Sequence, residues 1–445
     1  MSNFEKLSQE FLLKFLKEPW GFSFFPSSLF WKEGLSKNSL KEIFSSFFES
    51  LYLEDNHKLN LYIHIPFCSR ICSYCNCFKI YSNTSSDIDK YIDFLEKEAF
   101  MYYKKNSNNK IKINSLFIWW WTPNILSVEQ FNKLFSIVEK YFDLSILREF
   151  LVDCHPNHLD KEKINLFDKL WVNRITLAIQ SLDEKVLSLN NRDCYDLSHI
   201  NNLINHISKT KIKINIDLLI WLVWQDFDSI KKDIDYFNSK SVDNISDHFF
   251  MLSNNINYNL PDYYLDTIIK AKNYLKEVWI NSNSSNVQED DYSSRKSSII
   301  SLWSYGVTSI FSSIIYSKPN IQDYYESLSD NKLPFSKWFL LSKIEEQIKY
   351  IYLNILSWIN VKEFYNIFEE NIFEVFHKEI KFLYGNDIIL KEGNMIISKK
   401  NDLETFTYLW IFFLPLIKST KIDFSLNLEW ELSNFFLEDW SLIDR

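Results

Sequence analysis

Four of the six cysteines fall within ten residues of one another and could hold a metal centre: Cys68, Cys72, Cys75 and Cys77. Iron–sulfur clusters are held by cysteine thiolates in short, turn-forming segments of this kind. Three thiolates on a four-iron cluster leave one iron open to bind and cleave a small molecule. Four thiolates would close the cluster and suit electron transfer or a structural role. The spacing therefore predicts an iron–sulfur site, which is reactive if one iron stays open.

Two other interpretations of the cysteines compete with a cluster. A structural zinc site also uses four thiolates, but its ligands usually come as two pairs separated by a longer loop. Cys75 and Cys77 are too close in sequence to form such a pair comfortably. Buried core cysteines are the second alternative, and a group of four in a polar segment disfavours it. We favour the cluster and interpret the isolated Cys154 and Cys194 as bystanders.

The cysteines follow a strand directly, and five more strand–helix units come after them. Short β-branched or aromatic runs alternate with longer segments of helical periodicity. The predicted strands are 59–65, 115–118, 149–152, 174–178, 213–219 and 247–252. The predicted helices are 87–104, 128–142, 161–170, 196–208 and 227–238. Six such units in a row indicate a parallel sheet, either curled into a barrel or open and doubly wound, with the ligand site at the carboxyl ends of the strands.

The segments on either side of these units have different patterns. An amphipathic stretch over 40–51 follows a turn at Phe25–Ser28, and the polar run Asn281–Ser298 predicts a loop. Past Pro334 the chain predicts a small, mostly helical, winged-helix-like domain. Its expected elements are helices near 338–357 and 361–383, a hairpin over 388–398 and a further helix. The predicted domains are an N-terminal extension, an α/β core and this C-terminal domain, over 1–57, 58–330 and 331–445.

The bulk composition excludes some classes of protein. The net charge of −9 argues against a nucleic-acid binder, because phosphate contacts need a basic face. The longest apolar run, 408–417, is too short to span a membrane. The apolar residues between Phe4 and Leu16 have helical spacing and do not form the continuous stretch of a secretory signal. We therefore expect a cytoplasmic protein, in a reducing compartment where clustered cysteines bind metals.

The segment around the cysteines resembles the signature of the HemN family of radical S-adenosylmethionine (SAM) proteins. It reads Tyr62-Ile-His64-Ile-Pro66-Phe67-Cys68-x-x-x-Cys72-x-Tyr74-Cys75-x-Cys77. This family includes the oxygen-independent coproporphyrinogen III oxidase and the haem chaperone HemW, and the resemblance extends from roughly Phe22 into the C-terminal domain. It implies a partial (β/α)6 barrel, S-adenosyl-L-methionine as a cofactor, and a [4Fe–4S] cluster on Cys68, Cys72 and Cys75.

Later matches to the family follow in the family's order. Its second strand ends in Gly-Gly-Gly-Thr-Pro, where this chain has three tryptophans before Thr122 and Pro123, and Asp153 stands where a longer Glu is usual. The resemblance implies cofactor-binding residues at Tyr62, Trp120, Trp121, Thr122, Asp153, Gln180, Arg192 and Asp217, and catalytic residues at Tyr62 and Cys77. Taken singly, Gln180, Arg192 and Asp217 are better explained as a strand-end hydrogen bond, a surface cation and a buried cap. In this order behind the cysteine motif, we favour cofactor binding.

The resemblance also implies a reaction. An electron from the cluster cleaves SAM, and the resulting radical abstracts hydrogen; in the oxidase branch, coproporphyrinogen III is decarboxylated to protoporphyrinogen IX. Cys77 and the segment Phe22–Pro26 favour that branch. A HemW-like haem chaperone and a radical SAM enzyme on another substrate remain alternatives. The implied partners are a porphyrinogen or haem-like molecule and an electron donor protein, and we expect the C-terminal domain to cover the barrel mouth.

Tryptophan stands repeatedly where the family's motifs have glycine, and the chain has 15 Trp but only 5 Gly. The positions are Trp119, Trp120, Trp121, Trp171, Trp221, Trp224, Trp279, Trp303 and Trp358. An indole cannot cheaply adopt glycine's backbone angles, and it fills the volume that a ligand needs. We hypothesise that UGA codons for glycine have been read as tryptophan. The alternative is a degenerate homologue that no longer binds SAM, although decay would scatter many residue types over these positions.

Overall fold

The computed structural model describes 42–49, 58–75, 78–81, 84–119, 122–220, 222, 224–247, 263–279, 297–310, 312–354 and 358–399. The chain divides into two compact units. One is Glu33–Ser342, and the other combines Met1–Lys32 with Lys343–Arg445. Among the described helices, none is both long and apolar enough to cross a bilayer.

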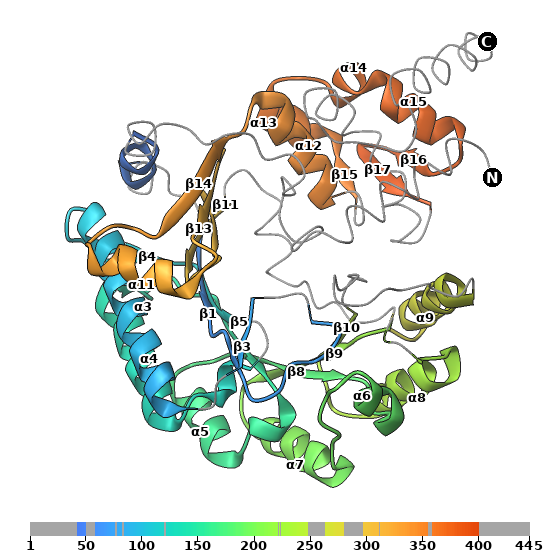
Figure 1. Ribbon diagram of the computed structural model, residues 1–445. Helices are drawn as coiled ribbons and strands as arrows, with labels where there is room; N and C mark the ends of the chain where they lie inside the picture. Colours follow the sequence, from blue (N-terminus) through green and yellow to red (C-terminus); the bar gives the residue numbers. More distant parts are fainter. Residues whose placement is uncertain are drawn as a thin grey trace. The chain divides into compact units, whose positions relative to one another are not determined.

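A ten-stranded sheet forms the first unit, in the order β10-β9-β8-β7-β5-β1-β11-β12-β13-β14 (Figure 1). Its parallel strands are β1 (Lys58–His64), β5 (Ser115–Trp119), β7 (Glu149–Cys154), β8 (Arg174–Gln180), β9 (Lys213–Leu218), β10 (Asn244–Asp247) and β11 (Ser297–Leu302). Its antiparallel strands are β12 (Val307–Ile310), β13 (Ser313–Ser317) and β14 (Phe335–Leu340). Because β10 and β14 are two separate edges, the sheet is a partial barrel, as the resemblance implied.

Helices cover the outer side of this curved sheet (Figure 1). They are α3 (Ser85–Lys105), α4 (Val128–Tyr141), α5 (Lys161–Lys169), α6 (Glu184–Leu189), α7 (Leu197–Ile207), α8 (Phe227–Asn238), α9 (Tyr263–Trp279) and α11 (Ile321–Ser329). Several begin where a polar side chain accepts a hydrogen bond from a first-turn N–H, which satisfies an otherwise unpaired donor. These N-cap residues are Ser127, Asp160, Asp183, Asp196 and Asp226.

The short elements connect the long ones at both ends of the sheet. They are β2 (Phe67–Cys68), β3 (Ile80–Tyr81), β4 (Ile111–Lys112), β6 (Phe142–Asp143) and the 3-10 turns η2 (Pro123–Ile125) and η3 (Pro156–His158). β2 pairs with β3 in the segment that follows β1.

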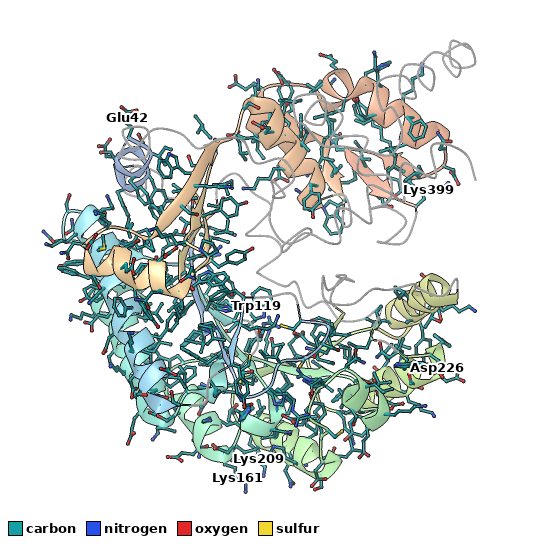
Figure 2. All side chains as sticks on the ribbon, viewed as in Figure 1. Glu42, Trp119, Lys161, Lys209, Asp226 and Lys399 are labelled. Atoms are coloured by element: carbon teal, nitrogen blue, oxygen red, sulfur yellow. The ribbon has the colours of Figure 1, made fainter. Side chains whose placement is uncertain are left out.

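The two faces of the parallel sheet differ in polarity, because side chains alternate along each strand and paired residues share a face. Tyr62 pairs with Phe117, and His64 with Trp119. Figure 2 shows Trp119 inside the curve of the sheet, whereas Lys161 and Lys209 lie at the outer rim. The alternate residues of β1, such as Leu61 and Ile63, are apolar and fully buried on the opposite, helix-covered face. Polar side chains therefore collect on the inner face, where a ligand can be held.

Most predicted elements of this unit are confirmed within a few residues. The sixth strand was placed too late, because it is β10 at 244–247 and not 247–252; residues 248–252 lie outside the described residues. The predicted loop 281–298 is wrong at its end, since Ser297 and Ser298 begin β11, and its remainder is outside the described part. The sequence did not predict α6 or the antiparallel strands β12–β14.

The described part of the second unit is mostly helical. It contains α12 (Lys343–Asn354), α13 (Val361–Phe368), α14 (Ile372–Val375), α15 (His377–Gly385) and a three-stranded sheet of β15 (Ile359–Asn360), β16 (Ile389–Glu392) and β17 (Met395–Ser398). The predicted hairpin is confirmed as the β16–β17 pair. The prediction of one helix over 361–383 is wrong. Helix α13 ends at its C-cap Glu369, whose φ is 54°, and α14 and α15 follow as separate helices.

Two further sequence predictions concern residues at the margins of these units. The first helix predicted for the C-terminal domain, near 338–357, starts too early, because 338–340 belong to β14. The amphipathic stretch 40–51 is helical over its described residues, 42–49. The turn at 25–28 and the final helix lie outside the described residues.

Candidate functional site

The cysteine segment lies at the carboxyl end of β1, and residues from a distant loop hold it there. The backbone N–H of Ser73 donates to the carbonyl of Asn190 at 3.0 Å. The Asn191 side-chain amide donates to the carbonyl of Ile71 at 2.7 Å. The segment is thus tied to the loop after α6, and its conformation does not depend on local sequence alone.

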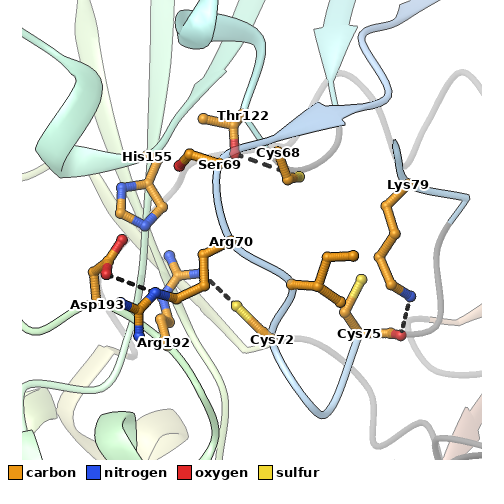
Figure 3. A pocket seen from close by; sticks show the side chains of 11 residues that line it. Cys68, Ser69, Arg70, Cys72, Cys75, Lys79, Thr122, His155, Arg192 and Asp193 are labelled. Atoms are coloured by element: carbon orange, nitrogen blue, oxygen red, sulfur yellow. Dashed lines mark hydrogen bonds and ion pairs between the residues drawn. The ribbon is translucent and has the colours of Figure 1, made fainter. Parts of the chain in front are cut away.

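Cys68, Cys72 and Cys75 line one pocket (Figure 3). The other residues around it are Ser69, Arg70, Ile71, Lys79, Thr122, His155, Arg192 and Asp193. The Cys68 sulfur is 3.8 Å from Thr122 Oγ1, and the Cys72 sulfur is 3.7 Å from an Arg192 guanidinium nitrogen. The pocket therefore gathers three thiols, one of them beside a hydroxyl and another beside a fixed positive charge.

The Arg192 guanidinium is buried and held in a single orientation. It donates to Tyr195 Oη at 2.6 Å, to Tyr74 Oη at 3.0 Å and to the carbonyl of Ala178. An arginine keeps its charge in such a site. A fixed hydrogen-bond donor therefore lies beside the Cys72 sulfur and orients it.

Burial, together with the neighbouring thiols of Cys75 and Cys72 and against the opposing effects of Thr122 and Arg192, raises the pKa of the Cys68 thiol to about 12. Without a metal this cysteine is therefore protonated, and a metal must displace the proton to bind. Within the described ranges, no three ligand-type side chains converge closely enough for a single metal ion.

The carboxyl end of β1 carries a second polar group, which consists of Tyr62 and His64. The His64 Nε2 lies 3.1 Å from the carbonyl of Phe78, which can only accept, so Nε2 carries the proton. Nδ1 then accepts the Tyr62 hydroxyl at 3.1 Å. Burial lowers the pKa of His64 to about 3, so the ring is neutral. The Trp303 ring packs on it with 4.1 Å between centroids.

Gln180 ends β8 in an unusual conformation. Its φ is 70°, and the register of β8 and β9 shifts between Ala178 and Gln180. Bulges of this kind re-aim a side chain at the rim of a sheet. Its Oε1 is buried and has no hydrogen-bond partner among the described residues. A buried acceptor that lacks a partner suits a site completed by a polar ligand.

The remaining residues implied to bind SAM lie on neighbouring strands. Asp153 and Asp217 are buried on the inner face, and Asp217 accepts a hydrogen bond from Asn215 at 3.0 Å. The thiol pocket is lined by none of four residues implied to bind SAM, namely Tyr62, Asp153, Gln180 and Asp217. Cys77, Trp120 and Trp121 lie outside the described residues. The thiols, the fixed cation and the partnerless acceptor fit the cluster and SAM.

Sequence reasoning missed several residues that line the pocket. His155 is buried, and its pKa is lowered well below the usual value by burial and by Arg192 and His158. Lys79 donates to the carbonyl of Cys75 at 2.6 Å, and Arg70 pairs with Asp193 at 2.9 Å. For Arg70 and Lys79 the available signal was their closeness to the cysteines in sequence. For His155 it was its position directly after a strand.

Comparisons with known proteins agree with this geometry. The radical SAM superfamily matches residues 62–234. The chain is 32% identical over 177 residues to the haem chaperone HemW of Lactococcus lactis, covering 40% of this chain and 45% of that protein. It is 26% identical over 178 residues to the oxygen-independent coproporphyrinogen III oxidase of Escherichia coli, covering 40% and 38%. The chain thus spans less than half the length of these curated relatives.

Among solved structures, coproporphyrinogen III oxidase (HemN) from Escherichia coli has the same fold. The TM-score is 0.73 at 17% identity, over 87% of this chain and 95% of that one. The fold and the thiol pocket define a radical SAM enzyme, which uses a [4Fe–4S] cluster and SAM. Within that superfamily the chain is similar to the HemN and HemW proteins.

Proposed function

We propose that this enzyme removes hydrogen from the propionate side chains of a porphyrinogen, leading to their oxidative decarboxylation, as the family resemblance implies. The Escherichia coli relative is by its name a coproporphyrinogen III oxidase. The observation that carries the proposal is the pocket in which Cys68, Cys72 and Cys75 meet the Arg192 guanidinium. When bound, the cluster and SAM supply one-electron bond cleavage and a radical that abstracts hydrogen. An electron donor protein and a cytoplasmic location are parts of the same proposal.

The chain's own residues have distinct roles in this proposal. The three thiolates hold the cluster, and Arg192 orients the Cys72 sulfur through its hydrogen bond. Thr122, Asp153, Gln180 and Asp217 bind SAM, and Gln180 offers its buried, partnerless Oε1 for that purpose. Tyr62 lies against the neutral His64, which fixes its hydroxyl beside the site.

The proposal retains from the family resemblance the residues that lie outside the described part. Trp120 and Trp121 stand at backbone positions that meet SAM, and Cys77 is assigned to catalysis together with Tyr62. The C-terminal domain, predicted to begin at 331, is proposed to cover the barrel mouth.

A haem chaperone is the second candidate function. Its support is that the match to the HemW of Lactococcus lactis is 32% identical, against 26% for the oxidase of Escherichia coli, over stretches of similar length. A chaperone would bind haem and deliver it without changing a porphyrinogen.

The test uses protein made without oxygen and reconstituted with iron and sulfide, as written and with glycine at the nine motif tryptophans. Iron content, deoxyadenosine released from SAM, porphyrinogen decarboxylation and haem binding are measured on both. Decarboxylation supports the oxidase. Haem binding with SAM cleavage but no decarboxylation favours the chaperone, and a cluster without any SAM cleavage in either version contradicts the catalytic proposal.

A matched cysteine series controls for the loss of thiols in general. Changing Cys68, Cys72 and Cys75 together to Ala should remove nearly all bound iron, because no ligand set remains. Cys194→Ala should leave the iron content unchanged, since Cys194 is exposed and does not line the pocket. Equal iron in the two variants would show that the cluster is held elsewhere.

A further inference from the structure

Two tryptophans adopt the left-handed backbone conformation that normally belongs to glycine. Trp171 has φ of 62° and Trp224 has φ of 71°. A β-carbon makes this conformation costly, and for a bulky residue it is a genuine outlier. Among the described glycines, Gly393 alone has positive φ. Left-handed positions thus carry tryptophan more often than glycine in this part of the chain, which inverts the usual preference.

Trp171 occupies the position directly after helix α5 where glycine ends a helix. The Val172 N–H donates to the carbonyl of Phe167 at 2.9 Å, and the Trp171 N–H to that of Asp168 at 3.3 Å. Leu170 is the C-cap. This pair of bonds is the Schellman motif, whose left-handed residue is usually glycine and sometimes asparagine.

Trp224 occupies the third position of a tight turn. The backbone N–H of Gln225 donates to the carbonyl of Leu222 at 3.1 Å, which closes a four-residue turn. The Gln225 side chain accepts from the Leu222 N–H at 2.7 Å and fixes the turn from inside. A positive φ at the third position occurs in type II and type I′ turns, and in both that position favours glycine or asparagine.

Neither indole gains packing that would offset the backbone cost. Trp171 is 74% exposed and Trp224 is 67% exposed. A large apolar side chain at an exposed, left-handed position is unfavourable on both counts. The two positions come from different elements, a helix end and a loop after β9, so one local irregularity does not explain both.

We infer that the natural protein carries glycine at positions 171 and 224, and that both are UGA codons read as tryptophan. This inference is independent of the proposed function, because it follows from backbone conformation and exposure alone. One decoding rule acts on every UGA codon, so the same change extends to tryptophans at the site. Trp303 is 1% exposed and packs against both His64 and Tyr62. If its codon is also UGA, the volume of its ring becomes space beside Tyr62.

The test is the mass of peptides from the protein isolated from its natural source, together with the codons of its gene. Trypsin cleaves after Lys169 and Arg174 and releases Leu170–Arg174, which contains one tryptophan position. It also releases Ile214–Lys231, which contains positions 221 and 224. We expect UGA at both codons, the shorter peptide at the mass with glycine, and fragment ions of the longer one that place glycine at 224.

Three results would overturn the inference. UGG codons at 171 and 224 would do so directly. Peptides from the natural protein with tryptophan masses would do so whatever the codon. UGA at one position and UGG at the other would separate the two sites and refute a common cause. The codons at 119–121 and 303 then show how far the same decoding reaches into the site.

Discussion

At the scale of single residues, the site is dominated by buried groups whose charge state the fold has fixed. His64 is neutral because burial lowers its pKa, and its Nε2–H bond to the Phe78 carbonyl, which acts in the opposite direction, does not offset that effect. Cys68 stays protonated until a metal displaces its proton. Arg192 is charged and held by three oxygen acceptors. These states give a site that responds to metal binding and to pH in predictable directions.

The neutral His64 makes the cluster-free protein less stable in acid. The pKa of His64 is about 3 in the folded protein and 6.5 in the unfolded chain. Between pH 3 and pH 6.5 the unfolded chain therefore binds one proton more than the folded protein. Stability is therefore greatest above pH 6.5 and falls as the pH drops towards 3, by about 2 kcal/mol at pH 5 from this residue. Urea unfolding at pH 7 and pH 5 should show a smaller loss for His64→Gln than for the parent. An identical loss of stability in His64→Gln and in the parent would refute the assignment of this pH dependence to His64. His206→Gln serves as the control.

Trp171 allows the left-handed conformation to be tested on recombinant protein. Trp171→Gly should be more stable than Trp171→Ala by about 1 kcal/mol, because only glycine avoids the β-carbon clash. The control is Trp358, which is also exposed but has no positive φ. There Gly should be no more stable than Ala. Chemical unfolding measures all four variants, and a preference for alanine at 171 would contradict the conformation.

At the scale of elements, the strands β7 and β8 are joined at their amino ends by a buried ion pair. Arg174 Nε lies 2.9 Å from Glu149 Oε1, and both side chains are less than a tenth exposed. The site lies at the opposite, carboxyl ends of the same strands. This separation assigns stability to one end of the sheet and chemistry to the other.

Breaking this pair should therefore lower stability without touching the cluster. Glu149→Gln leaves a charged guanidinium buried and should cost about 3–5 kcal/mol of unfolding free energy. Replacing both residues, as Glu149→Leu with Arg174→Met, should cost less because no buried charge remains. Unfolding curves give the first result, and iron content per folded protein should match the parent. Loss of iron at full folding would mean that the pair also shapes the site.

At the scale of the whole molecule, the cluster and SAM residues all belong to one unit. Every proposed ligand from Tyr62 to Asp217 lies within Glu33–Ser342. The described part of the other unit, after Ser342, contributes none of them. The first unit therefore holds all the residues proposed for the radical chemistry.

A chain ending at Ser342 tests whether the first unit suffices for the radical chemistry. We expect it to take up iron and to cleave SAM, because it keeps every proposed ligand, and its porphyrinogen decarboxylation shows what the residues after Ser342 contribute. Iron analysis, deoxyadenosine release and product formation measure the three steps. A truncated protein that folds, as judged by circular dichroism, but binds no iron would contradict this division.

The sequence by itself determined the chemistry and most of the parallel core. The spacing of Cys68, Cys72 and Cys75 predicted an iron–sulfur centre, since a cluster needs thiolates on a short turn, and the radical SAM match supports that cofactor. Helix α8 was predicted over its observed residues, because Asp226 caps a regular amphipathic segment. Signals of this kind are local, and a linear reading can detect them.

Only the tertiary structure decided what surrounds the thiols. Arg192 reaches Cys72 across 120 positions of chain, and His155 enters the same pocket from β7. The antiparallel strands β12–β14 were missed because their short, serine-containing runs carry no strong period. Which distant residues meet is fixed by strand order and register, which bring the carboxyl ends of separate strands to one edge, and no local pattern encodes that order.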